Sequence, residues 1–226
     1  PGNAKITAPN DTTIDKTSNY SIDYYPGTLT VTANDTLIKV IPADGTKVYD
    51  GTPLTKTAHE DFTVTGVPDG LTWTATADGT VTNVTPGAGE KAVNEVTSFH
   101  IFDAGGNDVT EYFTNIDITA KGTLTITPKP LTITAASDTN VYDGTALTNS
   151  SYTHTDLVEG ETIESVTVAG SQTIAGTSAN VPSNAVIKTA NDQLSTPNYD
   201  ITDENGTLKV TQKPLTITAG DSSKVY

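Results

Sequence analysis

The sequence predicts an all-β protein, and three features lead to that prediction. Thr occurs 45 times among the 226 residues, whereas hydrophobic residues account for only 35% of the chain. As a β-branched residue, Thr suits the half-buried surface of a pleated strand. Several short segments alternate between apolar and hydroxyl side chains, which is the period of a strand, and no window of about eleven residues keeps a helical period. We therefore expect strands and turns throughout the chain.

Three sequence markers recur along the chain, so we expect a protein built from repeats. VYDGT occurs at 48–52 and 141–145, and Val225-Tyr226 starts a third copy. KPLTIT occurs at 129–134 and again at 213–218. A GTL triplet followed by an alternating segment begins at Gly27, Gly122 and Gly206, and it closes each repeat.

These markers divide the chain into four expected segments. Residues 1–34 are expected to be the C-terminal part of a preceding repeat, 36–127 and 129–211 two complete repeats, and 213–226 the first strand or strands of a following repeat. Complete repeats of this length fall in the normal size range of domains, so each is expected to fold on its own. The chain begins at Pro1 rather than at Met, and we expect it to be a piece of a longer array.

The opening of each repeat is expected to be a strand followed by a turn. In the second copy Leu131 and Ile133 alternate with Thr residues, which predicts a half-buried strand over 130–134. Ile38 and Val40 take the corresponding places in the first copy. The Asp-Gly pairs at 50–51 and 143–144 are typical turn residues.

Two alternating segments, 71–75 and 163–168, are expected to be strands in the middle of the repeats. Each repeat is then expected to close with a β-hairpin. Tyr199 and Ile201 share one face, Asn205-Gly206 is a favoured two-residue turn, and 208–210 returns on the matching face. The related motifs NYSI, NIDI and NYDI, at 19–22, 115–118 and 198–201, place this hairpin in every copy.

The joint between complete repeats is expected to be short and stiff. Three residues separate Thr127, at the end of one repeat, from Leu131 in the first strand of the next. Pro128 and Pro130 are two of them, and proline fixes φ and biases its predecessor toward extended geometry. Stiff joints between independent domains predict an extended rod.

Together these motifs resemble the MBG repeats, also called YDG/MBG, which occur in tandem in large bacterial surface proteins and adhesins. The resemblance rests on KPLTIT, VYDGT, the segment LVEGET at 157–162, NYxI and GTLxVT, and it covers nearly the whole chain. The sequence departs from the pattern at Ile116, which stands in the place of Tyr, and at 66–71. The resemblance implies an extracellular all-β repeat from an adhesin or cell-wall protein, without enzymatic activity.

Charge and composition exclude several classes of function. The chain has 12 basic and 27 acidic residues, a net charge of -15, and all of its basic residues are Lys. Nucleic-acid binding is excluded because no basic cluster can replace the counterions of phosphates, and the same charge would repel anionic membranes. No apolar run approaches the ~18 residues of a membrane span. Because Cys is absent, disulfides and cysteine metal sites are excluded as well.

Residues that commonly carry catalysis are few and scattered. His59, His100 and His154 share no recognised spacing with a nucleophile or a metal ligand, and we expect them to be ordinary structural or surface side chains. GxSxG, HExxH and phosphate-loop motifs do not occur in the sequence. We therefore expect no enzyme, no catalytic residues and no cofactor.

Two acidic groups are candidates for calcium, which often stiffens extracellular rods: Asp200 with Asp203 and Glu204, and Asp103 with Asn107 and Asp108. Neither group has the spacing of an EF-hand. Both lie beside predicted turns, where Asp and Asn are favoured for backbone reasons. We therefore expect no metal site.

A domain without Cys cannot form disulfides, but an intramolecular Lys–Asn isopeptide bond could cross-link it. Strand alternation directs Lys39 outward, however, and Lys129 and Lys213 fall in the predicted joints. Since Lys is rarely fully buried, we expect these lysines to be solvated and the chain to be free of such a bond.

Aromatic side chains could stack on sugars of mucin or of cell-wall glycans. Trp73 alternates with Leu71 and Ala75 and is therefore expected in the core. The adjacent Tyr24 and Tyr25 must point to opposite faces of a strand, so one of them is expected to be exposed. A single exposed Tyr does not form a platform for sugars.

The sequence thus favours a tandem array of small β-sandwich-like domains that form an extended rod, with β-grasp-like units as the alternative topology. The expected function is that of a structural stalk that projects a distal binding domain of an adhesin from a bacterial cell wall. Its expected partners are neighbouring repeats of the same chain, with neither nucleic acid nor membrane. The alternative function is a multivalent module in which the repeats themselves bind host mucin or glycan.

Overall fold

The computed structural model describes residues 4–84 and 92–226 of the chain. Within these residues the protein is all-β, as predicted: it has strands and four 3-10 helices of three residues each. No helix of the described part is long and apolar enough to cross a membrane. The expected segments 1–34 and 36–127 include residues 1–3 and 85–91, which lie outside the described residues, and the segment boundaries stay predictions.

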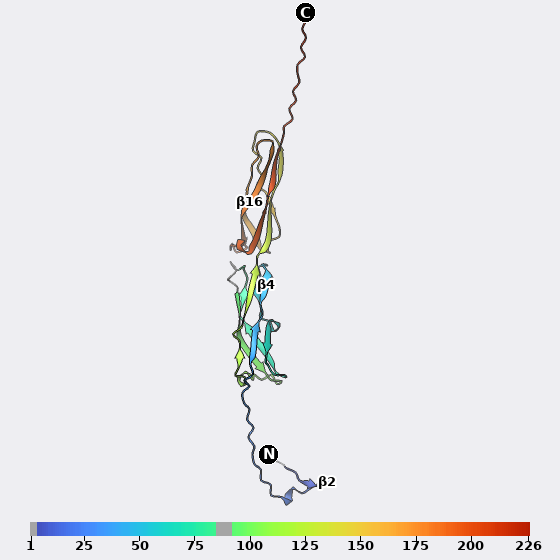
Figure 1. Ribbon diagram of the computed structural model, residues 1–226, viewed down its shortest axis with the longest axis vertical. Helices are drawn as coiled ribbons and strands as arrows, with labels where there is room; N and C mark the ends of the chain where they lie inside the picture. Colours follow the sequence, from blue (N-terminus) through green and yellow to red (C-terminus); the bar gives the residue numbers. More distant parts are fainter. Residues whose placement is uncertain (1–3, 85–91) are drawn as a thin grey trace.

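A two-stranded sheet of β1 (Thr7–Ala8) and β2 (Asp11–Asp15) lies near the N-terminus and is followed by η1 (Thr17–Asn19). After it, two larger groups of sheets follow one another along the chain (Figure 1). The first group, which we call the first unit, contains β3 (Ile38–Pro42), β4 (Gly45–Val48), β5 (Leu54–Thr55), η2 (His59–Asp61), β6 (Phe62–Thr65), β7 (Thr72–Ala77), β8 (Thr80–Val81), β9 (Ala92–Phe102), η3 (Thr110–Tyr112), β10 (Ile116–Asp117) and β11 (Lys121–Thr127). The second unit contains β12 (Lys129–Ala135), β13 (Asp138–Val141), β14 (Tyr152–His154), β15 (Glu161–Ala169), β16 (Gly176–Thr189), η4 (Thr196–Asn198), β17 (Tyr199–Glu204) and β18 (Gly206–Thr211).

Each unit is a sandwich of two main sheets, to which the first unit adds a two-stranded sheet of β5 and β8. In the first unit the sheets have the orders β10-β3-β6 and β4-β11-β9-β7, and in the second unit β14-β12-β17 and β13-β18-β16-β15. The core lies between them because alternate residues point inward: Ile38 and Val40 from one sheet pack with Phe99 and Ile101 from the other. The β-grasp alternative, which requires a helix over one sheet, is not formed by the described residues.

The predicted opening strands and turns are confirmed. Ile38 and Val40 on β3, like Leu131 and Ile133 on β12, are buried. Gly51 and Gly144 of the Asp-Gly turns have positive φ values of 78° and 89°. The expected middle strands are β7 and β15.

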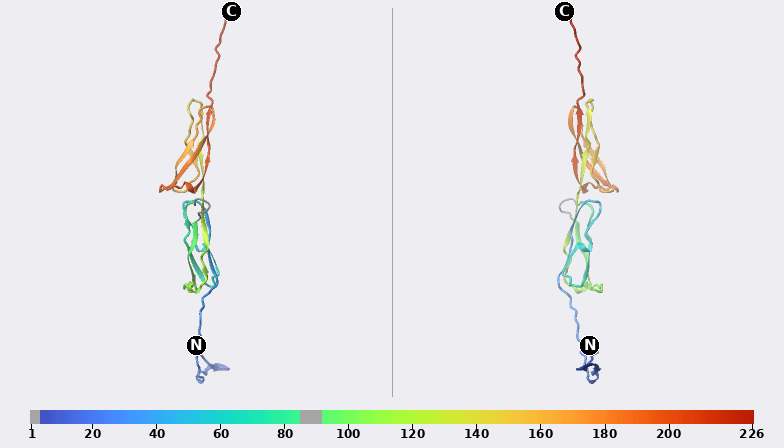
Figure 2. Two further views of the ribbon diagram at one scale, coloured as in Figure 1. Left: turned by 60° about the vertical axis from the view of Figure 1, so that its left-hand side comes forward. Right: turned by 90° about the vertical axis from the view of Figure 1, so that its right-hand side faces the viewer.

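The first two strands of each unit pair in parallel with its last two strands. β10 pairs with β3 and β11 with β4 in the first unit, while β17 pairs with β12 and β18 with β13 in the second. Since parallel strands run in the same direction, the chain enters each sandwich at one end and leaves it at the opposite end. This succession is visible from three directions (Figure 1; Figure 2).

The predicted closing hairpin is wrong. β17 and β18 do not pair with each other, because β17 belongs to the sheet of β12 and β18 to the sheet of β13 and β16. Neither Asn205 nor Gly206 has the positive φ that a two-residue hairpin turn of this kind needs. Glycine is required here because the backbone of residue 206 lies close to that of Ala136: a Cβ on Gly206 would lie 2.3 Å from the carbonyl oxygen of Ala136.

The predicted equivalence of the motifs at 115–118 and 198–201 is also wrong. The amide of Ile101 donates to Thr110 Oγ1 and that of Ile187 to Thr196 Oγ1, both at 2.8 Å, so η3 and η4 are the matching elements. Phe113, which follows η3, therefore takes the place of Tyr199, which follows η4. Ile116 instead occupies a strand position, opposite Ile38 on β3.

The joint between the units is shorter than predicted. β11 ends at Thr127 and β12 begins at Lys129, so Pro128 alone lies between the strands and Lys129 belongs to a strand rather than to a joint. Pro130 is tolerated in β12 because β14 pairs with β12 only from Ile133 onward, which leaves the side near Pro130 unpaired. Lys213 lies in a segment, 212–226, without regular structure.

Candidate functional site at the junction of the two units

The contact between the two units is centred on Tyr49, which follows β4 in the VYDGT motif. Its amide donates to the carbonyl of Thr127 at 2.9 Å, which fixes Tyr49 beside the last residue of β11. The loop after it is held by Asp50, whose Oδ1 accepts hydrogen bonds from Lys47 Nζ and from the amide of Thr52. Tyr49 is only 4% exposed, because the second unit covers it.

Glu161, the first residue of β15, accepts a hydrogen bond from the hydroxyl of Tyr49. Tyr49 Oη donates to Glu161 Oε1 at 2.6 Å, and Ser195 Oγ donates to the same oxygen at 2.6 Å. Tyr199 Oη donates to the second oxygen, Oε2, and itself accepts the amide of Val158 at 2.9 Å. One carboxylate on the second unit thus collects hydroxyl donors from both units. We call Tyr49, Glu161, Ser195, Asn198 and Tyr199 the junction cluster.

Asn198 supplies a second polar contact across the junction. Its Oδ1 accepts the amide of Val84 at 2.9 Å, and its Nδ2 donates to Asn83 Oδ1 at 3.2 Å. The side chain is 5% exposed and also donates to Ser195 Oγ at 3.1 Å. Because a buried amide must be satisfied, Asn198 fixes the position of the residues at 83–84 relative to η4.

Apolar packing continues through the junction. Tyr49 and Ile126 of the first unit are buried in one cluster with Leu131, Ile133, Ile187 and Tyr199 of the second. The rings of Tyr49 and Tyr199 meet edge to face, with centroids 5.8 Å apart. Gly51 packs so closely that a Cβ there would lie 2.8 Å from Val158 Cγ1. The core of the second unit therefore extends into the end of the first.

Electrostatics keep the donors of the cluster protonated. Burial raises the pKa of Tyr49, and its hydrogen bond to Glu161 raises it further. The same two causes, in the same order, raise the pKa of Tyr199. Hydrogen bonds from Lys47 and Thr52 lower the pKa of Asp50 to about 2. The phenols thus remain neutral donors, while the turn carboxylate remains an acceptor.

The structure does not bring the predicted candidates of the sequence together. His59 stacks on Trp73 with centroids 3.9 Å apart, His100 Nδ1 lies 2.9 Å from Asp108 Oδ2, and His154 Nδ1 lies 2.8 Å from the carbonyl of Thr155. Trp73 packs against the core of the first unit, as predicted. The chemistry available at these positions is that of local packing and hydrogen bonding.

The two acidic candidates for calcium are used in local structure. Asp103 Oδ1 accepts the amides of Gly105 and Asn107, each at 2.9 Å, which closes a turn. Glu204 Oε2 accepts the hydroxyl of Thr134 at 3.0 Å. Among residues 4–84 and 92–226 no group of three or more His, Cys, Asp or Glu side chains could hold a metal ion.

The prediction for Lys39 is confirmed, since its side chain is exposed on β3. The prediction for Tyr24 and Tyr25 is wrong, because both are exposed, at 45% and 83%. These tyrosines lie in a segment, 20–33, that forms no strand, so the alternation of a sheet does not apply to them.

Sequence reasoning missed the junction cluster. It treated VYDGT as a turn motif, although only Asp50 and Gly51 are needed for the turn. The signal available was Tyr itself, which stands at 49, 142 and 226, one position before the Asp-Gly pair at 49 and 142. A turn does not require Tyr there, so the residue pointed to a contact beyond its own loop.

No family model and no curated protein matches the chain. Among solved structures, the fibronectin(III)-like modules of CbhA from Clostridium thermocellum match with 12% identity and a TM-score of 0.23, covering 82% of this chain and 100% of that chain. A superposition at this level supports no inference about the present protein.

Proposed function

We propose that the protein is part of a stalk: a tandem array of β-sandwich repeats that forms an extended rod on a bacterial cell surface and projects a distal binding domain of an adhesin. The chain has no enzymatic role in this proposal, and its partners are the neighbouring repeats. The observation that carries the proposal is the junction cluster, in which one unit buries the terminal Tyr49 of the unit before it.

The strand arrangement supports a role in bearing tension. The entry strand of each unit pairs in parallel with the penultimate strand, and the exit strand pairs in parallel with the second strand, so a force on the two ends of a unit acts along these strand pairs. β12 and β17 pair over Lys129–Thr134, and β13 and β18 pair over Asp138–Val141. Under this geometry the hydrogen bonds between the strands share the load and must break together.

The joint supports a role as a rod rather than as beads on a flexible string. Pro128 alone separates β11 from β12, and an extended chain covers at most about 3.6 Å per residue. The ends of the two sandwiches are therefore held in contact, and the junction cluster adds directional hydrogen bonds to that contact. An end-to-end succession of units lengthens the molecule with every repeat.

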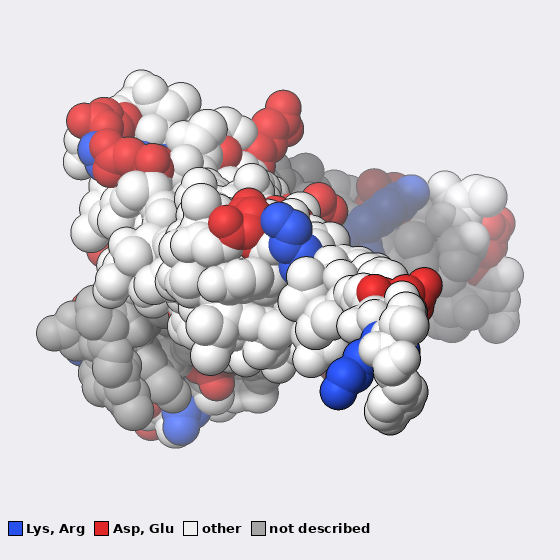
Figure 3. All heavy atoms as spheres, turned by 90° about the horizontal axis from the view of Figure 1, so that it is seen from above, with Lys and Arg blue, Asp and Glu red and all other residues white. Residues whose placement is uncertain are grey.

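The surface supports a spacer that avoids association. Seen along the long axis, acidic side chains are spread over a mostly uncharged face, with Lys in separate places among them (Figure 3). A net charge of -15 keeps neighbouring rods apart by repulsion. An extracellular location at the cell wall is part of the proposal.

Single-molecule force spectroscopy of the chain tests the proposal. Two separate unfolding events are expected, each lengthening the chain by about 250–300 Å, which is the extended length of roughly 80–90 residues at ~3.6 Å each minus the length of the folded unit. Forced unfolding is governed by the unfolding rate. Because the parallel strand pairs must separate before a unit can extend, we expect each unit to give a clear force peak. Extension at low force without peaks would contradict a load-bearing stalk.

A glycan array probed with the same fragment tests the alternative of a repeat lectin. The stalk proposal predicts no binding to mucin or cell-wall glycans above that of an unrelated acidic protein. Dose-dependent binding that competing free glycan removes would instead favour the adhesive module.

A further inference from the structure

Tyr142 of the second unit occupies the place that Tyr49 occupies in the first. Both follow the strand that pairs in parallel with the last strand of the unit, and both amides donate to the final Thr of that strand: Tyr49 to Thr127 at 2.9 Å and Tyr142 to Thr211 at 2.8 Å. Their exposures differ, because Tyr49 is 4% exposed and Tyr142 is 42% exposed. The difference is the cover that the second unit provides for Tyr49.

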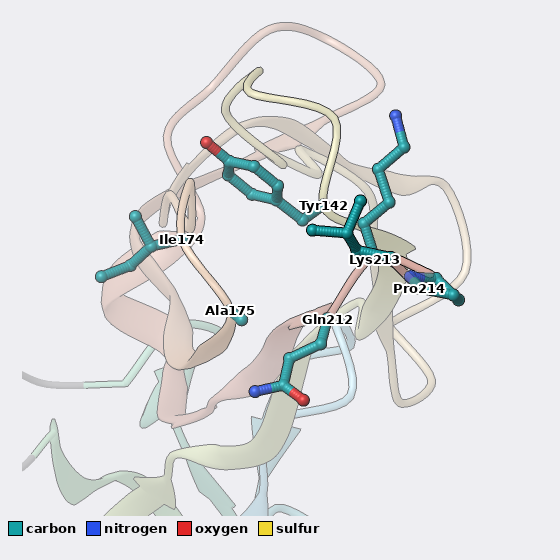
Figure 4. A pocket seen from close by; sticks show the side chains of 7 residues that line it. Tyr142, Ile174, Ala175, Gln212, Lys213 and Pro214 are labelled. Carbon is teal, nitrogen blue, oxygen red and sulfur yellow. The ribbon is translucent and has the colours of Figure 1, made fainter. Parts of the chain in front are cut away.

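An open hollow of about 750 Å³ lies beside Tyr142, lined by Tyr142, Ile174, Ala175 and the segment 212–215 (Figure 4). Each part of this lining has a counterpart in the occupied junction. Ile174 and Ala175 correspond to Asn83 and Val84, because the bridge from Leu147 to Gln172 matches the pairing of Leu54 with Val81. The segment 212–215 corresponds to 128–131. The hollow is thus an unfilled copy of the junction.

From this correspondence we infer that the hollow around Tyr142 is the docking site of a following β-sandwich, which presents a carboxylate at the position of Glu161. The inference rests on the proposed stalk function and names the chemistry of its next partner. A docked unit would bury the Tyr142 hydroxyl, and a buried hydroxyl without a partner is costly. In the occupied junction that partner is Glu161 Oε1.

The surface with which the second unit contacts Tyr49 differs from the corresponding surface of the first unit. Leu71 takes the place of Glu161, because the amide of each donates to the residue three positions back, Pro68 or Val158, just after a glycine with positive φ. Val109 takes the place of Ser195, with the same 2.8 Å hydrogen bond to the strand before it. The face of the first unit therefore lacks a carboxylate at this position, and it would leave a buried Tyr142 hydroxyl unpaired.

Ile174 adds a second requirement. It stands where Asn83 accepts the Nδ2 of Asn198, and an Ile side chain cannot accept a hydrogen bond. Ile174 is 70% exposed, so a docked unit would cover an apolar side chain at this position. The best partner therefore combines the carboxylate with an apolar side chain at the position of Asn198.

The test extends the protein by one unit. Residues 1–212 are followed by a second copy of residues 129–211, whose first residues repeat the sequence at 213–218, so the joint is unchanged. Nitration of Tyr142, followed by mass spectrometry, reports its exposure, with Tyr49 as the buried internal reference. We expect Tyr142 to react about tenfold more slowly in the extended chain than in the parent chain.

Two variants of the extended chain make the test specific. Glu161→Leu in the added copy alone reproduces the face of the first unit, and we expect it to return the reactivity of Tyr142 toward that in the parent. Ile174→Asn restores an acceptor for the Asn198 of the added copy, and we expect about fivefold further protection, the effect of one hydrogen bond.

Equal nitration of Tyr142 in parent and extended chains would overturn the inference, as would protection that Glu161→Leu leaves unchanged. An added copy that stays unfolded behind the hollow would overturn it as well. Small-angle scattering of the same extended chain separates this failure from that of the stalk: an elongated particle with reactive Tyr142 refutes only the docking site, whereas a compact particle refutes the stalk.

Discussion

Replacing Tyr49 by Phe removes one hydroxyl group from the junction and almost nothing else. The ring keeps its edge-to-face contact with Tyr199 and its place in the buried cluster. What is lost is the hydrogen bond to Glu161 Oε1 at 2.6 Å and the contact with Ser195 Oγ at 3.2 Å. The same substitution at Tyr142 is the matched control, because that ring is at the same place in the other unit and is 42% exposed.

The expected loss of stability in Tyr49→Phe depends on the hydrogen-bond donors that Glu161 keeps. Hydrogen bonds to charged groups contribute about 1.5–3 kcal/mol to stability. Glu161 is partly exposed and keeps Ser195 and Tyr199 as donors, so the lower end applies. We expect Tyr49→Phe to lower the free energy of unfolding by about 1.5 kcal/mol, roughly tenfold in the equilibrium constant. Tyr142→Phe should stay within about 0.5 kcal/mol of the parent, as is usual for surface positions.

Urea unfolding of the whole chain, followed by two probes, measures both effects. Trp73 is the single Trp of the chain and packs against the core of the first unit, so its fluorescence reports that unit. Far-UV circular dichroism reports the strands of both units. Equal shifts of the transitions by Tyr49→Phe and Tyr142→Phe would show that the hydroxyl of Tyr49 does not stabilise the junction.

Gly51→Ala should destabilise the protein by about 1–3 kcal/mol, because φ is 78° and the new Cβ would meet Val158. Gly144→Ala, at φ 89° with open space around it, should lose only the stability that the strained backbone costs. Thermal unfolding of the two variants measures the difference. Because the pKa values of Tyr49 and Tyr199 are raised in the folded state, their contribution to stability is complete below the unfolded pKa of about 10 and is lost as pH rises further; urea unfolding from pH 8 to 11 should show this decline, and a smaller one for Tyr49→Phe. The intact mass should equal the sequence mass, and a deficit of about 17 Da would reveal a Lys–Asn cross-link instead.

Local features of the fold could be predicted from the sequence because they depend on neighbouring residues. Alternation places Leu131 and Ile133 inside, and Asp143-Gly144 forms the turn that its residue types favour. The closing hairpin could not be predicted correctly, since Asn205-Gly206 is consistent both with a tight turn and with close packing of backbone. Gly206 is needed for its close contact with the Ala136 carbonyl, and the sequence does not reveal this contact because it is made across the sandwich.

The junction could not be predicted because its partners are far apart in the sequence. Tyr49 and Glu161 are separated by 112 positions, and Val84 and Asn198 by 114. No periodic pattern connects such residues. Repetition was the only clue, and it indicated that Tyr recurs without indicating what it contacts. Burial likewise depends on residues far along the chain: Leu131, which is 1% exposed, packs in one cluster with Ile187 and Tyr199.

We propose that the junction cluster locks adjacent units in one orientation, and this can be measured directly. Since the chain has no Cys, two introduced cysteines can be labelled cleanly, at the exposed Thr74 on β7 and the exposed Thr167 on β15. Pulsed electron paramagnetic resonance then measures the distance distribution between the two spin labels. We expect one narrow distribution, which broadens when Tyr49→Ala is combined with Asn198→Ala and stays narrow with Tyr142→Ala. A broad distribution in the parent chain, or one that the combined change leaves unaltered, would contradict it.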